Sequence, residues 1–331
     1  MPEGHTVHRL ATTFDQLFHG QRLAVSSPQG RFAAGAARLD GRVLVASEAW
    51  GKQMFLGFAQ DAGTADGDDV RWLRVHLGLY GAWTFAGDPG SDVVHAIGAP
   101  RRRVGESEVT SDASDASDGT WQPPAPRGQV RVRMTTERAS ADLTGPTACE
   151  VVTAAEKAAV QARLGPDPLR DDADPEAFVA ALTRSRSSVA LLLMNQEVLA
   201  GVGNIYRAES LYRARLDPRT PGTAVPRETA LELWADLVDL MHDGVRVGAI
   251  VTTRVEDRGE VPGGSLPDVP SVRARRRTRQ NTDGLPGAVP HDEAFYVYHR
   301  DGLPCRICGT TIALAELGGR TLYWCPRCQA S

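Results

Sequence analysis

Four of the five cysteines form two close pairs near the C-terminus, Cys305 with Cys308 and Cys325 with Cys328. Each pair has the C-x-x-C spacing of a tight turn that points two thiolates at one spot, and sixteen residues separate the pairs. Four thiolates form the tetrahedral ligand set that Zn²⁺ prefers, and they leave no open position for chemistry. Redox-active pairs are the alternative, but no βαβ pattern surrounds them. The spacing therefore predicts one structural zinc ion.

Between the two pairs, Gly318-Gly319-Arg320 has the composition of a hairpin tip. A tip held by zinc would present Arg320 rigidly, and a guanidinium group suits a phosphate. The alternative is an ordinary solvated arginine. The fifth cysteine, Cys149, follows the residues G-P-T-A, and we interpret it as a packed thiol without a functional role.

A glycine loop, Gly201-Val202-Gly203-Asn204, separates two expected helices. Glycines let backbone amides approach a ligand closely, and a helix N-terminus attracts anions, so a phosphate site fits. The loop follows no strand and contains no Walker lysine, which excludes a nucleotide-binding P-loop. A helix-turn-helix variant that grips a nucleic-acid backbone fits better, and a plain helix connection is the alternative.

The N-terminus, Met1-Pro2-Glu3-Gly4, can also do chemistry. Removal of Met1 would expose the secondary amine of Pro2. An α-amino group has a pKa of about 7.7–8.0, so much of it is neutral near neutral pH. Such an amine forms a Schiff base with an aldehyde-like carbon, and the carboxylate of Glu3 can transfer protons. The alternative is an ordinary chain start with a solvated carboxylate.

Composition limits the class of protein. The 331 residues suffice for about two domains, and 42% hydrophobic with 24% charged residues is typical of globular proteins. No apolar run reaches the roughly 18 residues of a membrane span, and the N-terminus is too polar for a secretory signal peptide. The net charge of −4 gives no global electrostatic case for nucleic acid, although residues 105–126 alone carry five acids and no base. The only lysines are Lys52 and Lys157.

Hydrophobic periodicity divides the chain into a strand-rich and a helical part. Apolar residues recur at helical spacing over 6–18, which predicts a first helix. Alternation over about 22–147 indicates many short strands, which favour a sandwich or barrel. The next part is helical, with Asp174-Pro175 as an N-cap and first helical residue, and alternation returns from Phe295. The fold class is therefore α+β.

Taken together, the PEG start, the segment NQEVLAGVGNIYRAE (195–209) and the four-cysteine finger resemble the formamidopyrimidine-DNA glycosylase / endonuclease VIII family. The segments HLGLYG (76–81), ADLTGPTACE (141–150) and LGPDPL (164–169) are also similar to that family. The resemblance covers nearly the whole chain in the family's order. PEG and Leu79-Tyr80 make it closer to the endonuclease VIII branch.

The resemblance implies a two-domain fold with DNA in the cleft between the domains. We expect a catalytic β-sandwich with a flanking helix at 1–148, which contains a disordered acidic insertion at 105–127. A helix-two-turn-helix domain follows at 149–255, then a flexible loop at 256–292. The zinc finger closes the chain at 293–331.

The resemblance also implies roles for individual residues. Pro2 would attack the sugar C1′, and Glu3 would assist ring opening and proton transfer. Lys52, in the turn W-G-K-Q, would contact phosphate and help to protonate departing groups. His76 touches phosphate or is a buried strand histidine. The family often has a second Glu where this chain has Thr6, and we transfer no role to that position.

DNA contacts follow from the same resemblance. Asn204 and Arg320 would bind phosphates from the loop of Gly201 and Gly203 and from the finger. Leu79 and Tyr80 would fill the space of a base that is flipped out of the duplex; ordinary strand core is their alternative.

The implied activity is a base-excision-repair DNA glycosylase and AP lyase. It removes oxidised bases and cleaves the strand by β- and δ-elimination. The PEG start and the wedge residues Leu79 and Tyr80 indicate oxidised pyrimidines as the substrates. The expected partner is damaged double-stranded DNA, without a membrane, and the protein is expected to act as a monomer in the bacterial cytoplasm. The alternatives are a non-catalytic damaged-DNA-binding zinc-finger protein and a zinc-dependent RNA-modifying factor.

Overall fold

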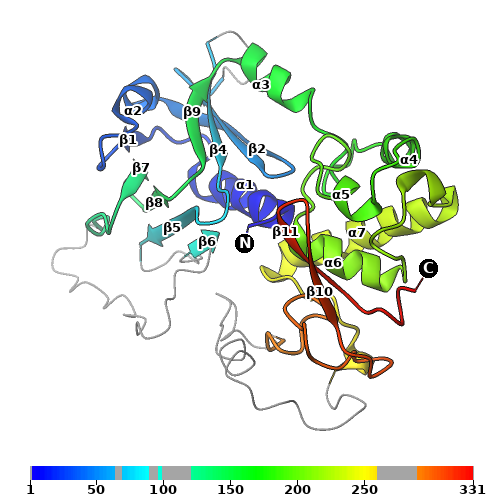
Figure 1. Cartoon of the computed structure of the whole chain (residues 1–331). Helices are drawn as coiled ribbons and strands as arrows, with labels where there is room; N and C mark the ends of the chain where they lie inside the picture. Colours follow the sequence, from blue (N-terminus) through cyan, green and yellow to red (C-terminus); the bar gives the residue numbers. More distant parts are fainter. Residues whose placement is uncertain (1, 64–68, 89–95, 99–120, 259–288, 331) are drawn as a thin grey trace. The chain divides into compact units, whose positions relative to one another are not determined.

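The computed structural model describes residues 2–63, 69–88, 96–98, 121–258 and 289–330. Most of the acidic insertion and of the 256–292 loop lies outside these residues, so both expectations stay predictions. The chain forms two compact units: Met1–Pro2 with Thr6–Ala162 is unit 1, and Glu3–His5 with Arg163–Ser331 is unit 2 (Figure 1). Among the described residues, no helix combines the length and apolar character needed to cross a membrane.

Unit 1 contains two antiparallel sheets. The four-stranded sheet has the order β2 (Val43–Trp50), β3 (Gln53–Ala59), β4 (Arg71–His76), β9 (Ala148–Val152). The five-stranded sheet has the order β1 (Ala24–Ser26), β7 (Val130–Thr135), β8 (Ala139–Thr144), β5 (Ala82–Gly87), β6 (Ala96–Gly98). Alternating burial along β7 confirms the strand pattern expected there, because one face of a strand packs inward while the other faces out.

One core joins the two sheets to helix α1 (Gly4–Phe18). Phe14 of this helix packs edge-on against Trp83 and Phe85 of β5, with ring centroids 4.7 and 5.4 Å apart. Residues of both sheets belong to the same buried cluster, among them Leu56 of β3 and Met134 of β7. The expected β-sandwich with a flanking helix is therefore confirmed.

Lys157 has a structural role in unit 1. Helix α3 (Ala154–Gln161) carries it over the outer face of the four-stranded sheet. Its Nζ lies 3.5 Å from the ring centroid of Trp72 and 2.6 Å from Glu48 Oε2. A Lys that combines an ion pair with an aromatic face stabilises packing, so of the two lysines only Lys52 remains a candidate for chemistry.

Unit 2 is helical and ends in a hairpin. Its helices are α4 (Pro175–Thr183), α5 (Val189–Leu192), α6 (Asn204–Arg213) and α7 (Arg227–Val247), with short 3₁₀ turns at Gly222–Ala224 and Val255–Asp257. The hairpin pairs β10 (Ala313–Leu317) with β11 (Arg320–Trp324). Asp174 caps α4 by accepting a hydrogen bond from Glu176 N, as the Asp-Pro pair predicts.

Three expectations need correction. A helix, α2 (Ala33–Leu39), interrupts the block expected to hold only strands. Residues 295–303 form turns rather than strands, because Phe295 and the residues up to Val297 are buried in succession instead of alternately. The first unit ends after Ala162 and not at 148, because β9 pairs with β4 and α3 packs beside it.

Candidate active site and metal centre

Glu3 is fully buried and its carboxylate sits on the N-terminus of helix α6. Its Oε2 accepts hydrogen bonds from Gly203 N at 2.9 Å and Tyr206 N at 3.3 Å, and its Oε1 accepts one from Ile205 N at 2.8 Å. A helix N-terminus offers unpaired amides and a partial positive charge, so it binds a carboxylate well. The sequence-predicted proton-transfer residue is thus held rigidly by unit 2.

The glycine loop makes this capping possible. Gly4 N donates to Gly201 O at 2.8 Å, and a Cβ on Gly203 would lie 2.5 Å from Glu3 Cδ. Any side chain at Gly203 would therefore displace the carboxylate. The amides of Gly201 and Gly203 already bond to Gln196 and Glu3, which corrects the expectation that they cradle a phosphate. The predicted DNA contact of this loop would therefore have to use other atoms, such as the Asn204 side chain.

Pro2 is linked directly to this anchored residue. It precedes Glu3 outside any helix or strand, and consecutive Cα atoms lie about 3.8 Å apart across a trans peptide. The ring nitrogen of Pro2 therefore stays within a few ångströms of the Glu3 backbone. Removal of Met1 would leave an amine one residue before an anchored carboxylate, as the predicted Schiff-base chemistry requires.

Asn204 and Arg320 are connected through Arg207, a fully buried arginine of α6. Arg207 Nη2 donates to Asn204 Oδ1, and also to Thr321 O at 2.8 Å. Because the amide oxygen of Asn204 accepts this bond, its NH₂ group is left to donate elsewhere. Thr321 directly follows Arg320, so one guanidinium joins the loop and the finger. Burial lowers the pKa of Arg207 to about 10, which leaves it charged at neutral pH.

The hairpin tip has the expected form. Gly318 and Gly319 adopt φ angles of +60° and +68°, a conformation that favours glycine and fits a tight two-residue hairpin turn. Arg320, the first residue of β11, is exposed. The Arg320 side chain therefore has the exposure that the predicted contact with phosphate requires.

Tyr298 is a candidate residue of the active site that the sequence did not single out. Burial raises the pKa of its hydroxyl, and the negative charges of Glu3 and Tyr323 raise it further. The signal in the sequence was weak, because Tyr298 stands among three other aromatic or histidine residues in FYVYH.

Lys52 and His76 lie together in unit 1. Lys52 occupies the turn between β2 and β3, and His76 ends β4 directly opposite Gln53. Burial lowers the pKa of His76, and the positive charges of Lys52 and Arg74 lower it further. A neutral imidazole beside a lysine can donate one hydrogen bond to an anion. His76 is only partly buried, so it keeps contact with solvent.

Leu79 and Tyr80 are exposed, which overturns the alternative of strand core. They lie in the turn between β4 and β5, where Gly81 N donates to Leu77 O. Their exposed fractions are 41% and 81%, high for large apolar side chains. Exposure on a tight turn is what a side chain that enters a DNA stack requires.

His5 precedes Thr6, the position at which the family often has a second Glu. It is 5% exposed, and its ring meets Tyr206 edge-on with centroids 5.5 Å apart. A Cβ on Gly244 would lie 3.2 Å from His5 Cβ. His5 therefore packs the start of α1 against α6 and α7, whereas Thr6, 9% exposed, belongs to unit 1.

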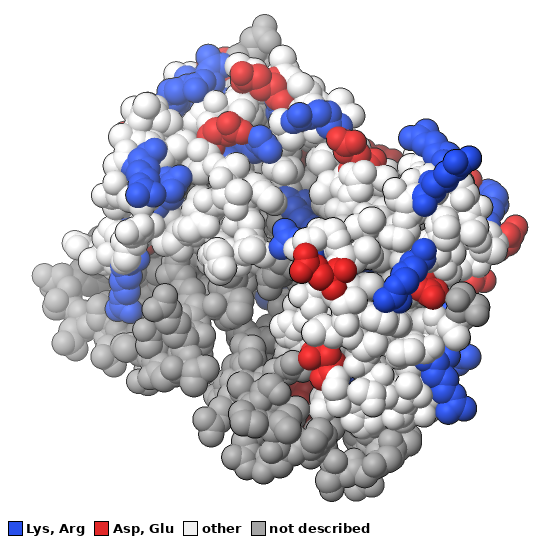
Figure 2. Space-filling view, in the orientation of Figure 1, with Lys and Arg blue, Asp and Glu red and all other residues white. Residues whose placement is uncertain are grey.

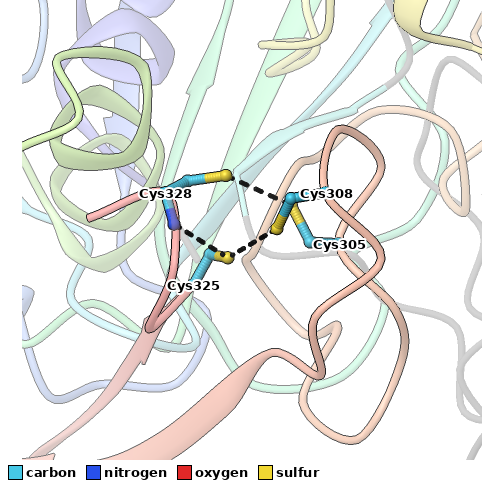
Figure 3. A group of neighbouring side chains, drawn as sticks. All are labelled: Cys305, Cys308, Cys325 and Cys328. Atoms are coloured by element: carbon cyan, nitrogen blue, oxygen red, sulfur yellow. Dashed lines mark hydrogen bonds between the residues drawn. The ribbon is translucent and has the colours of Figure 1, made fainter. Parts of the chain in front are cut away.

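The four paired cysteines meet at one point, as Figure 3 shows. Their sulfur atoms all lie within 4.8 Å of one another, with Cys305 to Cys328 at 3.8 Å and Cys308 to Cys325 at 3.5 Å. Tetrahedral coordination with Zn–S bonds of about 2.3 Å requires sulfur separations of about 3.8 Å. The donor set therefore fits zinc. By contrast, burial raises the pKa of Cys149 to about 12, in accord with a packed thiol.

Surface charge shows no uniformly basic face in the view of Figure 2, where basic and acidic side chains are interspersed. This agrees with the net charge of −4.

Comparison with known proteins gives matches along the chain. The formamidopyrimidine-DNA glycosylase N-terminal domain matches residues 1–145, its H2TH domain matches 164–256, and the zinc finger found in FPG and IleRS matches 302–330. Endonuclease 8 1 of Mycobacterium tuberculosis (strain ATCC 25618 / H37Rv) is 41% identical over 329 residues, which cover 99% of this chain and 100% of the relative. A formamidopyrimidine-DNA glycosylase of Thermus thermophilus is 34% identical, over 50% of this chain and 54% of the relative.

Solved structures share the fold. MutM (Fpg) from Thermus thermophilus superposes with a TM-score of 0.65 at 24% identity, covering 100% of this chain and 99% of that chain. Lactococcus lactis Fpg in a complex with DNA containing an abasic site has a TM-score of 0.66 at 17% identity, covering 99% and 100%. From the domain matches and the full-length relative together, the chain belongs to the formamidopyrimidine-DNA glycosylase / endonuclease VIII family, in its endonuclease VIII branch.

Proposed function

We propose that this protein is a DNA glycosylase and AP lyase of base excision repair that uses Pro2 as its nucleophile. The Pro2 nitrogen attacks C1′ of the damaged nucleotide, the base leaves, and opening of the sugar ring produces an iminium ion. Proton removal from C2′ then expels the 3′ phosphate, and a second elimination expels the 5′ phosphate. The product is a one-nucleotide gap.

The observation that carries this proposal is the carboxylate of Glu3, the residue after Pro2, which three backbone amides hold in place. General acid–base catalysis requires a proton carrier at a defined position, and contributes about 10²–10⁴-fold in rate. A carboxylate that only solvated the chain start would lie in water. Glu3 is instead fully buried and held in one position, which supports its proposed role as a fixed proton carrier for Pro2.

Each unit contributes candidate phosphate-binding groups. In unit 1, Lys52 lies close enough to His76 to lower its pKa, after burial, the larger cause, and the family resemblance implies that Lys52 would also protonate departing groups. In unit 2, the Asn204 amide and the Arg320 guanidinium bind phosphates, with Arg207 holding their relative positions. Contacts of this kind orient the DNA and carry no sequence information.

The lesion has to leave the duplex before the chemistry can occur, at a cost of a few kcal/mol. Leu79 and Tyr80, exposed on their turn, fill the vacated space in the stack. We propose oxidised pyrimidines as substrates and double-stranded DNA as the partner. The protein acts on it as a monomer in the bacterial cytoplasm.

Zinc has a structural role in this scheme. Cys305, Cys308, Cys325 and Cys328 would hold one ion with four thiolates, which leaves no position for water. The metal supplies folding free energy to a hairpin that buries little apolar surface of its own. This keeps Arg320 in place and leaves the chemistry to Pro2 and Glu3.

Borohydride trapping on DNA with a single abasic site tests the proposal. Two proteins with the same tag are compared, one tagged at the C-terminus with Pro2 free and one with an uncleaved N-terminal tag. The first should form a covalent adduct whose linked peptide begins with Pro2, and the second should form none, because a peptide bond removes the lone pair. Equal trapping by both proteins would refute Pro2 as the nucleophile. DNA binding without trapping by either would indicate the non-catalytic binding protein.

A further inference from the structure

Helix α6 is buried on all sides but is not apolar. Its residues Asn204 to Tyr212 are all buried, and the polar side chains among them include Asn204, Arg207, Glu209, Ser210 and Tyr212. Buried polar groups need hydrogen-bond partners. The partners therefore show what the helix is built to hold.

Those partners lie in the finger and in the segment before it. Arg207 donates to Thr321 O of β11. Glu209 accepts hydrogen bonds from the backbone N–H groups of Tyr296, Val297 and Tyr298, at 2.7–2.8 Å. One side of the helix thus binds the chain that leads into the cysteine pairs.

A contact of Tyr212, near the end of α6, reaches the metal centre itself. The hydroxyl of Tyr212 lies 3.1 Å from Cys305 Sγ, and both residues are buried, with 5% and 0% exposed. The Tyr212 ring stacks on Tyr296, with centroids 4.8 Å apart and planes inclined by 24°. Stacking and burial leave the hydroxyl little freedom to turn away from the sulfur.

Zinc binding decides the direction of this hydrogen bond. A cysteine that binds zinc is a thiolate and has no proton to give. The phenol must then be the donor, and the Cys305 sulfur the acceptor. Cys325 receives its hydrogen bond differently, from the backbone Cys328 N at 3.4 Å within its own turn. Cys305 receives a side-chain donor from a different element.

We propose that Tyr212 is an outer-sphere residue of the zinc site, whose O–H donates to the zinc-bound thiolate of Cys305 and ties the metal to helix α6. The inference rests on the zinc ion of the proposed function. Donors to ligand atoms hold the ligand in place and moderate the charge that it gives to the metal. Because the N-terminus of the same helix holds Glu3, α6 connects the metal centre to the catalytic carboxylate.

The test compares Tyr212→Phe with Tyr296→Phe in the full-length protein. Both variants lose one hydroxyl from the same stacked pair, but the Tyr296 hydroxyl bonds to Asp257 and to the Arg254 backbone instead of to a thiolate. Zinc affinity is measured by competition with a chromophoric chelator. Outer-shell changes typically weaken metal binding by about 10–100-fold, so we expect a loss of that size in Tyr212→Phe and unchanged affinity in Tyr296→Phe.

Cobalt substitution supplies a readout that packing alone would not move. Removal of a hydrogen bond makes the Cys305 thiolate a stronger electron donor, so the sulfur-to-cobalt charge-transfer band of Tyr212→Phe should shift to longer wavelength. The band of Tyr296→Phe should match the wild type. A folded Tyr212→Phe protein with wild-type affinity and spectrum would overturn the inference, whereas a wild type that binds neither zinc nor cobalt would overturn the zinc proposal instead.

A measurement on the wild type covers the case in which Tyr212→Phe does not fold. Metal binding converts the acceptor of the Tyr212 hydroxyl into a thiolate, which should shift the near-ultraviolet tyrosine absorption to longer wavelength. The shift should be the same in Tyr296→Phe. Its absence in a protein that binds one zinc would contradict the proposed hydrogen bond.

Discussion

The two units hold their candidate residues in opposite ways. In unit 2, Glu3 and Arg207 are fully buried and hydrogen-bonded to backbone of α6 and β11. In unit 1, Lys52, Leu79 and Tyr80 lie in turns between strands, and Tyr80 is 81% exposed. Groups that must keep one position during proton transfer gain from rigid support, whereas a side chain that enters a base stack must be exposed before it binds. The contrast between anchored and exposed residues therefore reflects two tasks.

The largest effect should come from the anchored carboxylate. Glu3→Gln removes the charge and places an NH₂ donor against backbone N–H donors, so both the capping and the proton transfer suffer. We expect base excision to slow by about 10²–10⁴-fold, with a loss of about 1–3 kcal/mol in the free energy of unfolding. Single-turnover excision and denaturant unfolding measure the two parts. Excision at the wild-type rate would show that the cap has no catalytic purpose.

Loss of zinc should come next. Cys325→Ser, or chelation, should disorder the hairpin that carries Arg320 and weaken DNA binding by at least about tenfold. Pro2 remains an intact amine, so trapping on a high concentration of abasic DNA should survive in part. Binding isotherms and borohydride trapping on the same samples separate the effects. Complete loss of trapping at saturating DNA, with unit 1 folded, would mean that the metal centre acts on the chemistry.

The exposed finger arginine should have a uniform effect. Arg320→Ala should weaken binding to all DNA sequences alike, and the salt dependence should fall by about one unit of slope, since one phosphate contact is lost. Titrations at several salt concentrations measure it. Arg327, another exposed arginine of the finger, is a control for the general effect of positive charge. An equal effect of Arg327→Ala would mean that both arginines attract DNA through their charge alone and not through one placed contact.

The exposed wedge should matter for lesions inside a duplex and not for those in single strands. Base stacking on an aromatic side chain contributes about 1–3 kcal/mol, so Tyr80→Ala should slow duplex cleavage by roughly tenfold. Stability should not change, because the side chain is 81% exposed. Cleavage of matched single- and double-stranded oligonucleotides is the measurement. Equal losses on both substrates would argue against a wedge.

The smallest effect on DNA should follow replacement of the structural lysine. Lys157→Met should leave binding and cleavage unchanged while the free energy of unfolding falls by about 1 kcal/mol, because an ion pair and a cation–π contact are lost. Lys52→Met should weaken DNA binding and cleavage. Thermal unfolding and cleavage assays on the pair compare the two lysines, and a DNA defect in Lys157→Met would contradict the division.

Local patterns predicted much of this molecule. The cysteine spacing, the Gly318-Gly319 tip and the Asp174-Pro175 helix start depend on residues close together in the chain, and the structure has each of them. Alternation along β7 belongs to the same class. Helix α2 was not predicted because it is a short insertion among strands. The start of unit 2 was placed too early because strand pairing between β4 and β9 joins segments that are far apart in the sequence.

What the sequence by itself determined is the set of candidate reactive groups: Pro2, the carboxylate of Glu3, four paired cysteines and a few cations. Only the tertiary structure decided how each group is held. It gave the amides of Gly203, Ile205 and Tyr206 to Glu3, exposed Leu79 and Tyr80, and placed the Tyr212 hydroxyl against Cys305. The physical reason is that a hydrogen bond requires a donor and an acceptor about 3 Å apart, and about two hundred residues of chain separate Glu3 from the amides that bind it.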